Sequence, residues 1–507
     1  MEHERFGFMY ENARGGHLIV RHGSPRRITA PKGGFGMNER ISTAPPRLPR
    51  LGELPSFVSL MAGGWADADR TPDLVPGAVA AAAAHRELLS ALYPGRALVI
   101  GSGTAPVRSN DTYHDFRADS DFLWLTGAPV ERATLVLTPA GSGHDAALYL
   151  PAPHRPGGHA FFTDAAHGEL WVGPVPGLAD WRDALGVDVH DTADLPAALG
   201  RLSRPLVAGS PGQDLGAAAE TAPSEELGRA LADLRMIKDD WVIARLREAV
   251  DRTVEGFAAV TAEIPAAVRG GGERWLQGTF DRYARTVGNG PGYATIVGSG
   301  RHAPTLHWVR CDGPVAEDEL LLLDMGVEAR SHYTADVTRT FPASGTFSPV
   351  QRQVHDLVER AHRAGLAAVG PGRPFTDFHH ASMEVIARGL HDWGLLPVSV
   401  DEALSERGQH HRRYLVCGIG HHLGLDVHDC ARSTYESYHG RAMAPGMVLT
   451  VEPGLYFHAH DLTVPPELRG VGVRIEDDVL VTADGSDVLS DALPLDAAGL
   501  EGWMRRP

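Results

Sequence analysis

Residues 320–341, LLLLDMGVEARSHYTADVTRTF, determine how the second half of the chain is interpreted. Four leucines run directly into Asp324, and a β-branched run carries Asp336 twelve positions later, after a polar stretch that can turn. This pattern predicts two neighbouring strands, each with a carboxylate inside an apolar run. Desolvation strongly destabilises a buried carboxylate, and two on adjacent strands repel each other unless a cation lies between them. Either aspartate alone could instead lie at a strand end in solvent or in an ion pair.

The segment LVCGIGHHLGLDVHDC, residues 415–430, adds imidazoles to these carboxylates. It holds His421, His422 and His428 among glycines that allow close approach of backbone and ligand. His421 and His428 lie seven positions apart, so they need not bind one ion. A single histidine in such a segment is more often a core residue with satisfied hydrogen bonds than a ligand.

Two further strand-like runs, LTVEPGLYF at 449–457 and VGVRIEDDVLV at 471–481, contain Glu452 and Glu476. Both acids interrupt apolar sequence, as the two aspartates do. Four carboxylates and one imidazole form an oxygen-rich ligand set that suits Mn²⁺, Co²⁺, Fe²⁺ or Zn²⁺ rather than a structural zinc held by thiolates.

This ligand set is typical of a site with two divalent ions. Two such ions about 3.5–4 Å apart hold a hydroxide at neutral pH and polarise a carbonyl for attack. The predicted chemistry is therefore metal-assisted hydrolysis of an amide. It also needs donors for the oxyanion and a group that passes a proton to the leaving nitrogen. His307 in TLHWV, His428 and Glu452 are the candidates.

Composition excludes several other classes of protein. The 507 residues contain 47 Lys+Arg and 64 Asp+Glu, and the net charge of −17 disfavours a nucleic-acid partner. The three cysteines, Cys311, Cys417 and Cys430, are too few and too scattered for a disulfide framework or a zinc ribbon. Neither a secretory signal nor an apolar run long enough to span a membrane is found. These features favour the cytoplasm.

The chain divides into three parts. Residues 1–75 are rich in Gly, Pro and Arg and are expected to be a partly mobile extension. Met37 is a second plausible start, so residues 1–36 could be an upstream extension. Residues 76–225 alternate between helix-like and strand-like patterns, which predicts an α/β domain, and a Gly/Pro-rich stretch at 209–226 is the best linker candidate. Residues 226–507 form the second domain.

Particular elements are expected within these domains. A helix is predicted around Val79 to Leu92, and another at ADWRDALG. RALVIGSG, SDFLWLTG, ATLVLTP and AALYLP are predicted to be strands. The second domain is expected to begin with one long amphipathic helix, RMIKDDWVIARLREAVDRTVEGFAAVTAEI.

In their order along the chain, the motifs DMG…TADVTRTFP, GIGHHLGLDVHD, LTVEPGLYF and GVRIEDD resemble those of the pita-bread metallopeptidases, specifically aminopeptidase P. The resemblance covers about residues 77–490. FRADSDFLWLTG similarly resembles the signature of that family's creatinase-like N-terminal domain. The implied architecture is this creatinase-like α/β domain followed by a C-terminal pita-bread α/β metallopeptidase domain, and the implied assembly is a homodimer or homotetramer with N-terminal domains at the contacts.

The resemblance also implies a cofactor and its ligands. Two divalent ions, usually manganese, would be bound by Asp324, Asp336, His421, Glu452 and Glu476. Asp336 and Glu476 would be the bridging carboxylates. The activity implied is removal of the first residue from peptides whose second residue is proline, by attack of a metal-bridging hydroxide on the scissile carbonyl.

Three further residues are implied to contact substrate. TIVGSGRHAPTLHW is similar to the family segment whose last histidine lies near the metals, which implies His307. The histidine of DVHD implies His428, and the arginine before IED implies Arg474. One position departs from the family pattern. Four residues before the metal-binding histidine, these aminopeptidases usually have another histidine, and here the residue is Cys417. A thiol is smaller and a weaker hydrogen-bond donor.

Other activities of the same fold stay open from sequence. Prolidase, which splits Xaa-Pro dipeptides, shares these ligands. However, only 24 positions separate Glu452 from Glu476, and this short connection with its VPxxxRGxGVRIEDD pattern is similar to aminopeptidase P. Metal-independent creatinase and catalytically inactive binding modules of this fold lack the full ligand set. In this sequence all five ligand positions carry residues that can bind a metal. A family member with a different amide substrate remains an alternative because of Cys417.

Overall fold

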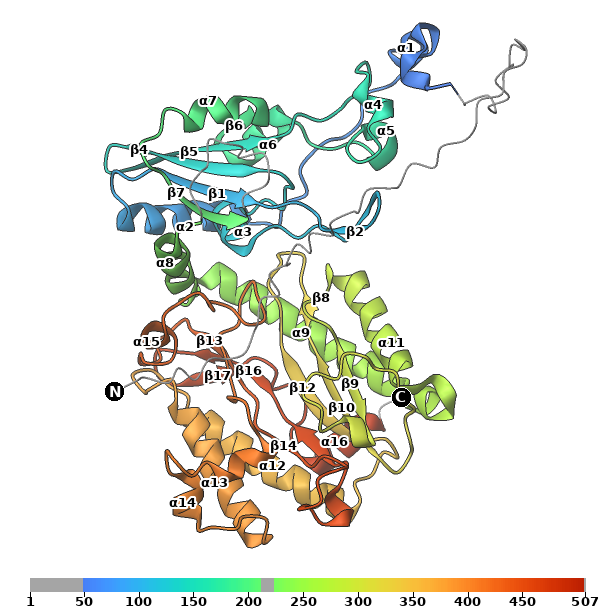
Figure 1. Ribbon diagram of the computed structural model, residues 1–507, viewed down its shortest axis with the longest axis vertical. Coiled ribbons are helices and arrows are strands. Elements are labelled where there is room, and N and C mark those ends of the chain that lie inside the picture. The colour runs from blue at the N-terminus through green and yellow to red at the C-terminus, as the bar shows by residue number, and fades with distance from the viewer. Residues whose placement is uncertain (1–48, 211–222, 506–507) are drawn as a thin grey trace, which may run out of the picture.

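The computed structural model describes residues 49–210 and 223–505, which form a smaller domain above a larger one in Figure 1. Most of the predicted extension and the centre of the predicted linker lie outside the described residues. Within 49–75, Pro55–Met61 forms helix α1, and Arg70 donates hydrogen bonds of 2.8 and 2.7 Å to Glu169. These residues of the extension therefore have a defined place against the smaller domain.

A five-stranded mixed sheet forms the centre of the smaller domain. Its strand order is β6-β5-β4-β1-β7, in which β1 pairs parallel with β7 and β5 with β6, whereas β4 is antiparallel to both neighbours. The strands are β1 (Leu98–Ser102), β4 (Thr134–Ala140), β5 (Gly143–Leu150), β6 (Asp188–Asp191) and β7 (Leu206–Ser210). A two-stranded ribbon, β2 (Val107–Ser109) with β3 (Thr112–Tyr113), extends from the sheet. The predicted strands RALVIGSG, ATLVLTP and AALYLP are β1, β4 and β5.

Short helices surround this sheet. They are α2 (Ala78–Leu92), α3 (Ser120–Thr126), α4 (Ala160–Thr163), α5 (Glu169–Val172), α6 (Leu178–Leu185), α7 (Leu195–Leu199) and α8 (Glu225–Arg235). The helices predicted at Val79 to Leu92 and at ADWRDALG are α2 and α6.

The prediction of a strand at SDFLWLTG is wrong, because these residues form helix α3. The Asp119 side chain accepts a hydrogen bond from the Asp121 amide at the start of the helix, and Gly127 ends it in the left-handed conformation. All seven residues of α3 are buried. A short segment that is buried on every side has no readable period, so its aromatic and leucine content suggested a strand.

The larger domain contains two three-stranded sheets, β12-β10-β9 and β13-β16-β17, and two strand pairs, β11-β8 and β14-β15. The strands are β8 (Gly290–Pro291), β9 (Ile296–Ser299), β10 (Leu320–Met325), β11 (Val327–Glu328), β12 (Val337–Pro342), β13 (Val448–Val451), β14 (Gly454–Tyr456), β15 (Gly472–Arg474), β16 (Asp477–Val481) and β17 (Ser486–Val488). A bridge between Thr338 and Glu476 joins the two halves of this strand system.

Helices cover the strands of the larger domain. The longest are α9 (Asp240–Ala262), α11 (Gly272–Val287), α12 (Pro349–Ala368) and α13 (Asp377–Asp392), and the shorter ones are α10 (Ile264–Ala266), α14 (Val400–Leu404), α15 (Tyr435–Tyr438) and α16 (Ala497–Met504). The expected long helix is present as α9, but it begins at Asp240 because the Asp239 side chain caps the Val242 amide. Within the described residues, no helix is both long and apolar enough to cross a bilayer.

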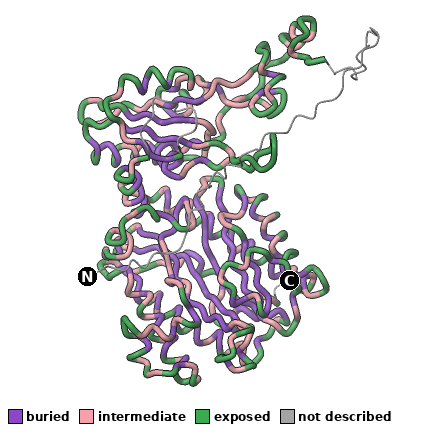
Figure 2. The backbone as a smooth tube through the Cα atoms, viewed as in Figure 1, coloured by how far each residue is buried: buried purple, intermediate pink, exposed green. Residues whose placement is uncertain are grey.

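The buried backbone is concentrated in the strands of both domains, as Figure 2 shows in purple. One apolar cluster crosses the boundary between the domains. It includes Leu89 and Phe122 of the smaller domain, Leu246 of α9, and Leu423 and Val448 of the larger domain. The two domains are therefore packed on each other by a shared core, and this packing fixes the position of the loop that carries His428.

Candidate metal centre

The five predicted metal ligands lie on strands or directly beside them. Asp324 is in β10, where it pairs with Thr338 of β12, and Asp336 is the residue before β12. Glu476 opposes the same Thr338 from the second half of the domain. Because one threonine faces both acids, carboxylates 152 positions apart in the sequence reach one place.

Backbone pairing brings the remaining two ligands to this place. Glu452 directly follows β13, and Thr450 of that strand donates its amide to the His421 carbonyl at 2.9 Å. His421 Nε2 then lies 3.4 Å from Asp336 Oδ2 and 3.6 Å from Glu452 Oε1. One ligand atom each from Asp336, His421 and Glu476 lie within 4.8 Å of one another. Three side chains from different strands and loops thus converge with a spacing that suits a shared cation.

Asp324 is held by two other side chains. Tyr293 donates its hydroxyl to Oδ1 at 2.6 Å, and Arg474 donates to Oδ2 at 2.5 Å. Arg474 also bonds to Thr338 at 3.1 Å and Tyr456 at 3.0 Å. The predicted substrate contact Arg474 is therefore buried, and its visible contacts orient a carboxylate.

Two further hydrogen bonds fix Glu476 and the backbone at Asp336. The Thr338 hydroxyl donates to Glu476 Oε2 at 2.6 Å, and the Asp336 amide donates to Asp478 Oδ2 at 3.0 Å. The first contact orients the Glu476 carboxylate, and the second fixes the backbone at Asp336. Sequence reasoning did not find Tyr293, Thr338 or Asp478 as supporting residues. The available signals were that Thr338 lies in the same motif as Asp336, and that Asp478 lies in the GVRIEDD motif with Glu476.

Burial, together with crowding of negative charge, perturbs the pKa values of the carboxyl groups. Burial raises the pKa of Glu452 to about 7. The charge of His421 opposes this rise, and the charge of Asp336 adds to it. Burial and the charges of Asp336 and Glu452 hold the pKa of Glu476 well above its ordinary value. Burial likewise raises the pKa of Asp324 to about 6, although Arg474 opposes this.

Asp336 and His421 form the exception to this pattern. Burial would raise the pKa of Asp336, but the His421 hydrogen bond and charge outweigh it and hold the pKa below its ordinary value. Burial lowers the pKa of His421, but Asp336 and Glu452 outweigh burial and raise it to about 8. Without a metal, a proton on His421 is the nearest compensating positive charge for these two acids.

His428 and His307 lie beside this cluster. The rings of His421 and His428 are perpendicular, with centroids 4.4 Å apart. His428 reaches solvent in the cleft, yet the surrounding protein and then His421 lower its pKa to about 4. Partial burial and Arg474 also lower the pKa of His307. Both imidazoles are therefore neutral near pH 7, a state in which each ring has one donor and one acceptor nitrogen.

Cys417 also lies close to the cluster and packs against the larger domain's core. Burial raises the pKa of its thiol to about 11, with Glu452 adding to the rise and Arg474 opposing it. At neutral pH the group is a thiol, and the thiolate is the nucleophilic form. These surroundings disfavour a nucleophilic role.

The residues present fit a pair of divalent ions. Three buried carboxylates, the partly buried Glu452 and one imidazole form a hard ligand set. Burial and the neighbouring acids raise the pKa of Asp324, Glu452 and Glu476, so their ionised forms need added positive charge. Divalent cations would supply that charge. A purely structural cluster of ion pairs would need more than the single guanidinium of Arg474 that contacts Asp324.

Comparison with known proteins agrees with this geometry. Residues 244–483 match the model of metallopeptidase family M24, and residues 82–206 match that of the aminopeptidase P N-terminal domain. The chain is 48% identical to "Xaa-Pro aminopeptidase 2" of Streptomyces coelicolor over 88% of this chain and 96% of the relative. It is 31% identical to "Xaa-Pro aminopeptidase" of Escherichia coli, over 83% of this chain and 96% of the relative.

Solved structures show the same arrangement. Aminopeptidase P from E. coli in its low-pH form superposes with a TM-score of 0.74 at 28% identity, over 84% of this chain and 98% of that one. Aminopeptidase PepP from Pseudomonas aeruginosa superposes with a TM-score of 0.72 at 29% identity, over 85% of this chain and 98% of that one. The match of both domains defines the class: a metallopeptidase of family M24 with an aminopeptidase P N-terminal domain.

Within that class, the chain belongs to the Xaa-Pro aminopeptidase family. The predicted fold, a creatinase-like α/β domain followed by a pita-bread domain, is confirmed, and so is the prediction of a metalloaminopeptidase. The proposed boundaries at residues 75 and 225, and the individual roles of the site residues, stay predictions.

Proposed function

We propose that the chain releases the N-terminal residue from peptides with proline in the second position, using two divalent ions, most favourably Mn²⁺. The observation that supports this best is the convergence of the five predicted ligands, Asp324, Asp336, His421, Glu452 and Glu476, in a chain 48% identical to proteins named Xaa-Pro aminopeptidase.

The chemistry of the bound ions would be to generate a hydroxide near neutral pH and to polarise the scissile carbonyl. The side chains have separate roles. Asp336 and Glu476 are the bridging carboxylates in this proposal, which agrees with their shared neighbour His421. Arg474 orients Asp324 and opposes the rise that burial causes in its pKa, and Thr338 orients Glu476 through its 2.6 Å hydrogen bond.

The two neutral imidazoles are assigned to substrate binding, and Glu452 to proton transfer. His428, perpendicular to His421, is placed to donate a hydrogen bond to the developing oxyanion or the substrate carbonyl. His307 is a second such donor, close enough to interact electrostatically with Asp336 and His428. Glu452, with a pKa raised to about 7 by burial, is suited to accept a proton and pass it to the leaving nitrogen.

Proline in the second position requires a dedicated pocket, because its amide nitrogen has no hydrogen and its φ is restricted. A cytoplasmic homodimer or homotetramer with N-terminal domains at the contacts is part of this proposal, with peptides rather than nucleic acids or membranes as partners. Light scattering at micromolar concentration tests the assembly, and a particle near the 54.3 kDa of one chain would contradict it.

An activity panel with Mn²⁺ added tests the function. It compares Ala-Pro dipeptide, Ala-Pro-Ala and Ala-Ala-Ala at equal concentration. We expect fast release of alanine from Ala-Pro-Ala alone. Faster cleavage of the dipeptide would favour a prolidase, and equal cleavage of Ala-Ala-Ala would refute the requirement for proline.

A further inference from the structure

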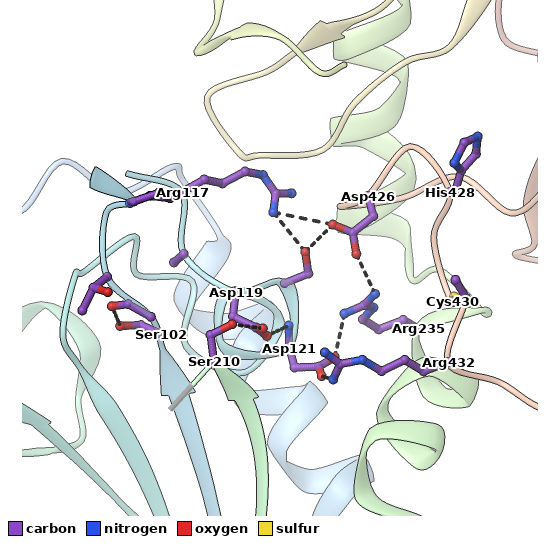
Figure 3. A pocket seen from close by; sticks show the side chains of 17 residues that line it. Ser102, Arg117, Asp119, Asp121, Ser210, Arg235, Asp426, His428, Cys430 and Arg432 are labelled. Carbon is purple, nitrogen blue, oxygen red and sulfur yellow. Dashed lines mark hydrogen bonds and ion pairs between the residues drawn. The ribbon is translucent and has the colours of Figure 1, made fainter. Parts of the chain in front are cut away.

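A cavity of about 620 Å³ lies between the two domains and opens beside His428 (Figure 3). Arg117 and Asp119 of the smaller domain line one wall, and His428 and Arg432 of the larger domain line the other. Because His428 is in ring contact with His421, the cavity begins one side chain away from the carboxylate cluster. Its volume is within the range of sites that bind small molecules and short peptides.

A buried ion network builds this cavity in advance of any ligand. Arg235, with 8% of its side chain exposed, donates to Asp121 and Asp429 at 2.6 Å each and to Asp426 at 3.1 Å. Asp121 belongs to the smaller domain, whereas the other two acids flank His428. The network therefore fixes both walls relative to each other, which lowers the cost of ordering a bound chain.

The arginines that line the cavity differ in how many of their donors already bind protein groups and in how far they are exposed. Arg117 is bound to Glu328 at 2.8 Å, to Ser120 at 3.1 Å and to the Leu425 carbonyl. Arg432 donates a 3.2 Å hydrogen bond to Asp121 and still exposes 56% of its side chain at the cavity wall. Arg432 is thus the guanidinium available to a further carboxylate, which it can bind with two parallel hydrogen bonds.

We propose that this cavity binds the part of a peptide substrate that follows the scissile bond, and that Arg432 binds the C-terminal carboxylate of short oligopeptides. The proposal rests on the proposed function. An aminopeptidase holds the first residue of its substrate at the reacting centre, so the rest of the peptide must extend from that centre through an open passage. The cavity at His428 is such a passage, and it makes the smaller domain part of the substrate site.

The test uses Mn²⁺-loaded enzyme and the peptides Ala-Pro-Ala, Ala-Pro-Ala-Ala and Ala-Pro-Ala-Ala-Ala, each as free acid and as C-terminal amide. We expect at least one length to show a kcat/KM about threefold to fivefold higher for the acid, the size expected of a half-exposed ion pair. Arg432→Gln should abolish this preference. Arg229→Gln, an exposed arginine of α8 paired with Glu225, is the matched control and should keep it.

Two outcomes would overturn the proposal: acids and amides cleaved equally at every length, or a preference that survives in Arg432→Gln. A parallel Ala-Ala series separates the two levels of inference. If the Ala-Ala peptides are cleaved as fast as the Ala-Pro peptides, the requirement for proline fails. The ratio of kcat/KM for the free acid to that for the amide can still be measured on the Ala-Ala peptides and tests the role of Arg432 separately. Calorimetric binding of Pro-Ala-Ala-Ala gives a readout without turnover, and Arg432→Gln should weaken that binding by the same factor.

Discussion

Glu476 illustrates how a residue can oppose folding and serve the site. Its pKa is held well above the ordinary value by burial and by the neighbouring acids, so its ionised form is unfavourable without a cation. We expect Glu476→Gln to raise the melting temperature of chelator-treated protein, because a buried repulsion is removed. The same change should lower activity by more than about 100-fold, since even residues that only support metal ligands cost 10–100-fold.

Calorimetry with and without chelator, together with elemental analysis, measures both effects. Asp392→Asn, at a side chain that is 80% exposed, is the control and should change neither. Full metal content and full activity in Glu476→Gln would contradict the bridging role.

His428 is predicted to donate one hydrogen bond to the substrate or the oxyanion, and it is not one of the predicted metal ligands. His428→Ala should lower kcat by roughly 10²–10³, the usual effect of losing one donor to an oxyanion. Metal content should stay at the wild-type level, because the ring lies beside His421 instead of replacing it. Steady-state kinetics with elemental analysis of the same sample checks this, and loss of metal in the variant would show that His428 is a ligand.

Cys417 is where this sequence departs from its family. Its thiol is neutral near pH 7 because burial raises its pKa to about 11. Cys417→Ala should therefore retain activity within about threefold, since the thiolate is the reactive form of cysteine. Cys417→His should be tolerated and could move substrate preference towards that of relatives with histidine. Complete inactivation of Cys417→Ala, with metals bound and the fold intact, would assign chemistry to the cysteine.

Residue identity alone predicted which side chains gather at the site but not what orients them. Asp324 and Glu476 were detectable because each interrupts an apolar run, which is unfavourable without a compensating partner. Tyr293 and Asp478 act through contacts between segments far apart in the chain, at 2.6 Å to Asp324 and 3.0 Å to the Asp336 amide. No period or spacing in the sequence contains that information.

At the scale of elements, patterning predicted strands β10 and β12 well and helix α3 wrongly. β10 and β12 are six-residue runs buried throughout; Asp324 lies inside β10, and Asp336 directly precedes β12 rather than lying within it. α3 is also buried throughout, but its ends are set by the Asp119 cap and by Gly127. A cap at one end and a left-handed glycine at the other were the available helix signals, and the apolar content outweighed them.

Helix α12 carries a buried histidine that should make stability depend on pH. His355 is fully buried against Phe347, and neither ring nitrogen has a hydrogen-bond partner. Burial, then Arg339 and Arg352, lower its pKa from 6.5 to about 4. The unfolded chain therefore binds this proton more readily than the folded one between these values, so stability is complete above pH 6.5 and is lost as pH falls towards 4.

Thermal melts between pH 4 and 8 measure this effect. His355→Leu should flatten the acid side of the profile, by up to about 3 kcal/mol at pH 4. His391→Gln, at a half-exposed site on α13, should leave the profile unchanged. Identical profiles for wild type and His355→Leu would show that other groups control acid unfolding.

At the scale of the whole molecule, two domains were predictable from alternating patterns, but their docking was not. The shared apolar cluster joins residues as distant as Leu89 and Val448. The ion network at Arg235 adds charge pairs between the domains, and the motifs that contain its acids gave no sign that these acids share one arginine. Docking depends on shape and charge complementarity between complete domains, which no local pattern encodes.

Arg235 should therefore matter to the whole molecule more than any exposed arginine. Arg235→Ala would remove the guanidinium that joins Asp121, Asp426 and Asp429. The acids would keep their separate cationic partners, which are Arg432 at 3.2 Å, Arg117 at 3.6 Å and Lys238 at 3.5 Å, respectively. Removing one partner of a buried ion network costs about 3–5 kcal/mol, because the other charges stay buried without compensation. At about 2–4 °C per kcal/mol, the melting temperature should fall by roughly 10 °C.

A second variant distinguishes charge imbalance from lost packing. Burial already raises the pKa of Asp121 to about 6 despite Arg235, so Asp121→Asn removes a charge that is costly once the arginine is gone. Arg235→Ala with Asp121→Asn should recover part of the lost stability, which identifies coupling between the two sites. Arg229→Ala is the matched surface control. If differential scanning calorimetry gave Arg235→Ala and Arg229→Ala the same melting temperature, the network would not hold the domains together, and the walls of the cavity beside His428 would have to be fixed by the apolar cluster alone.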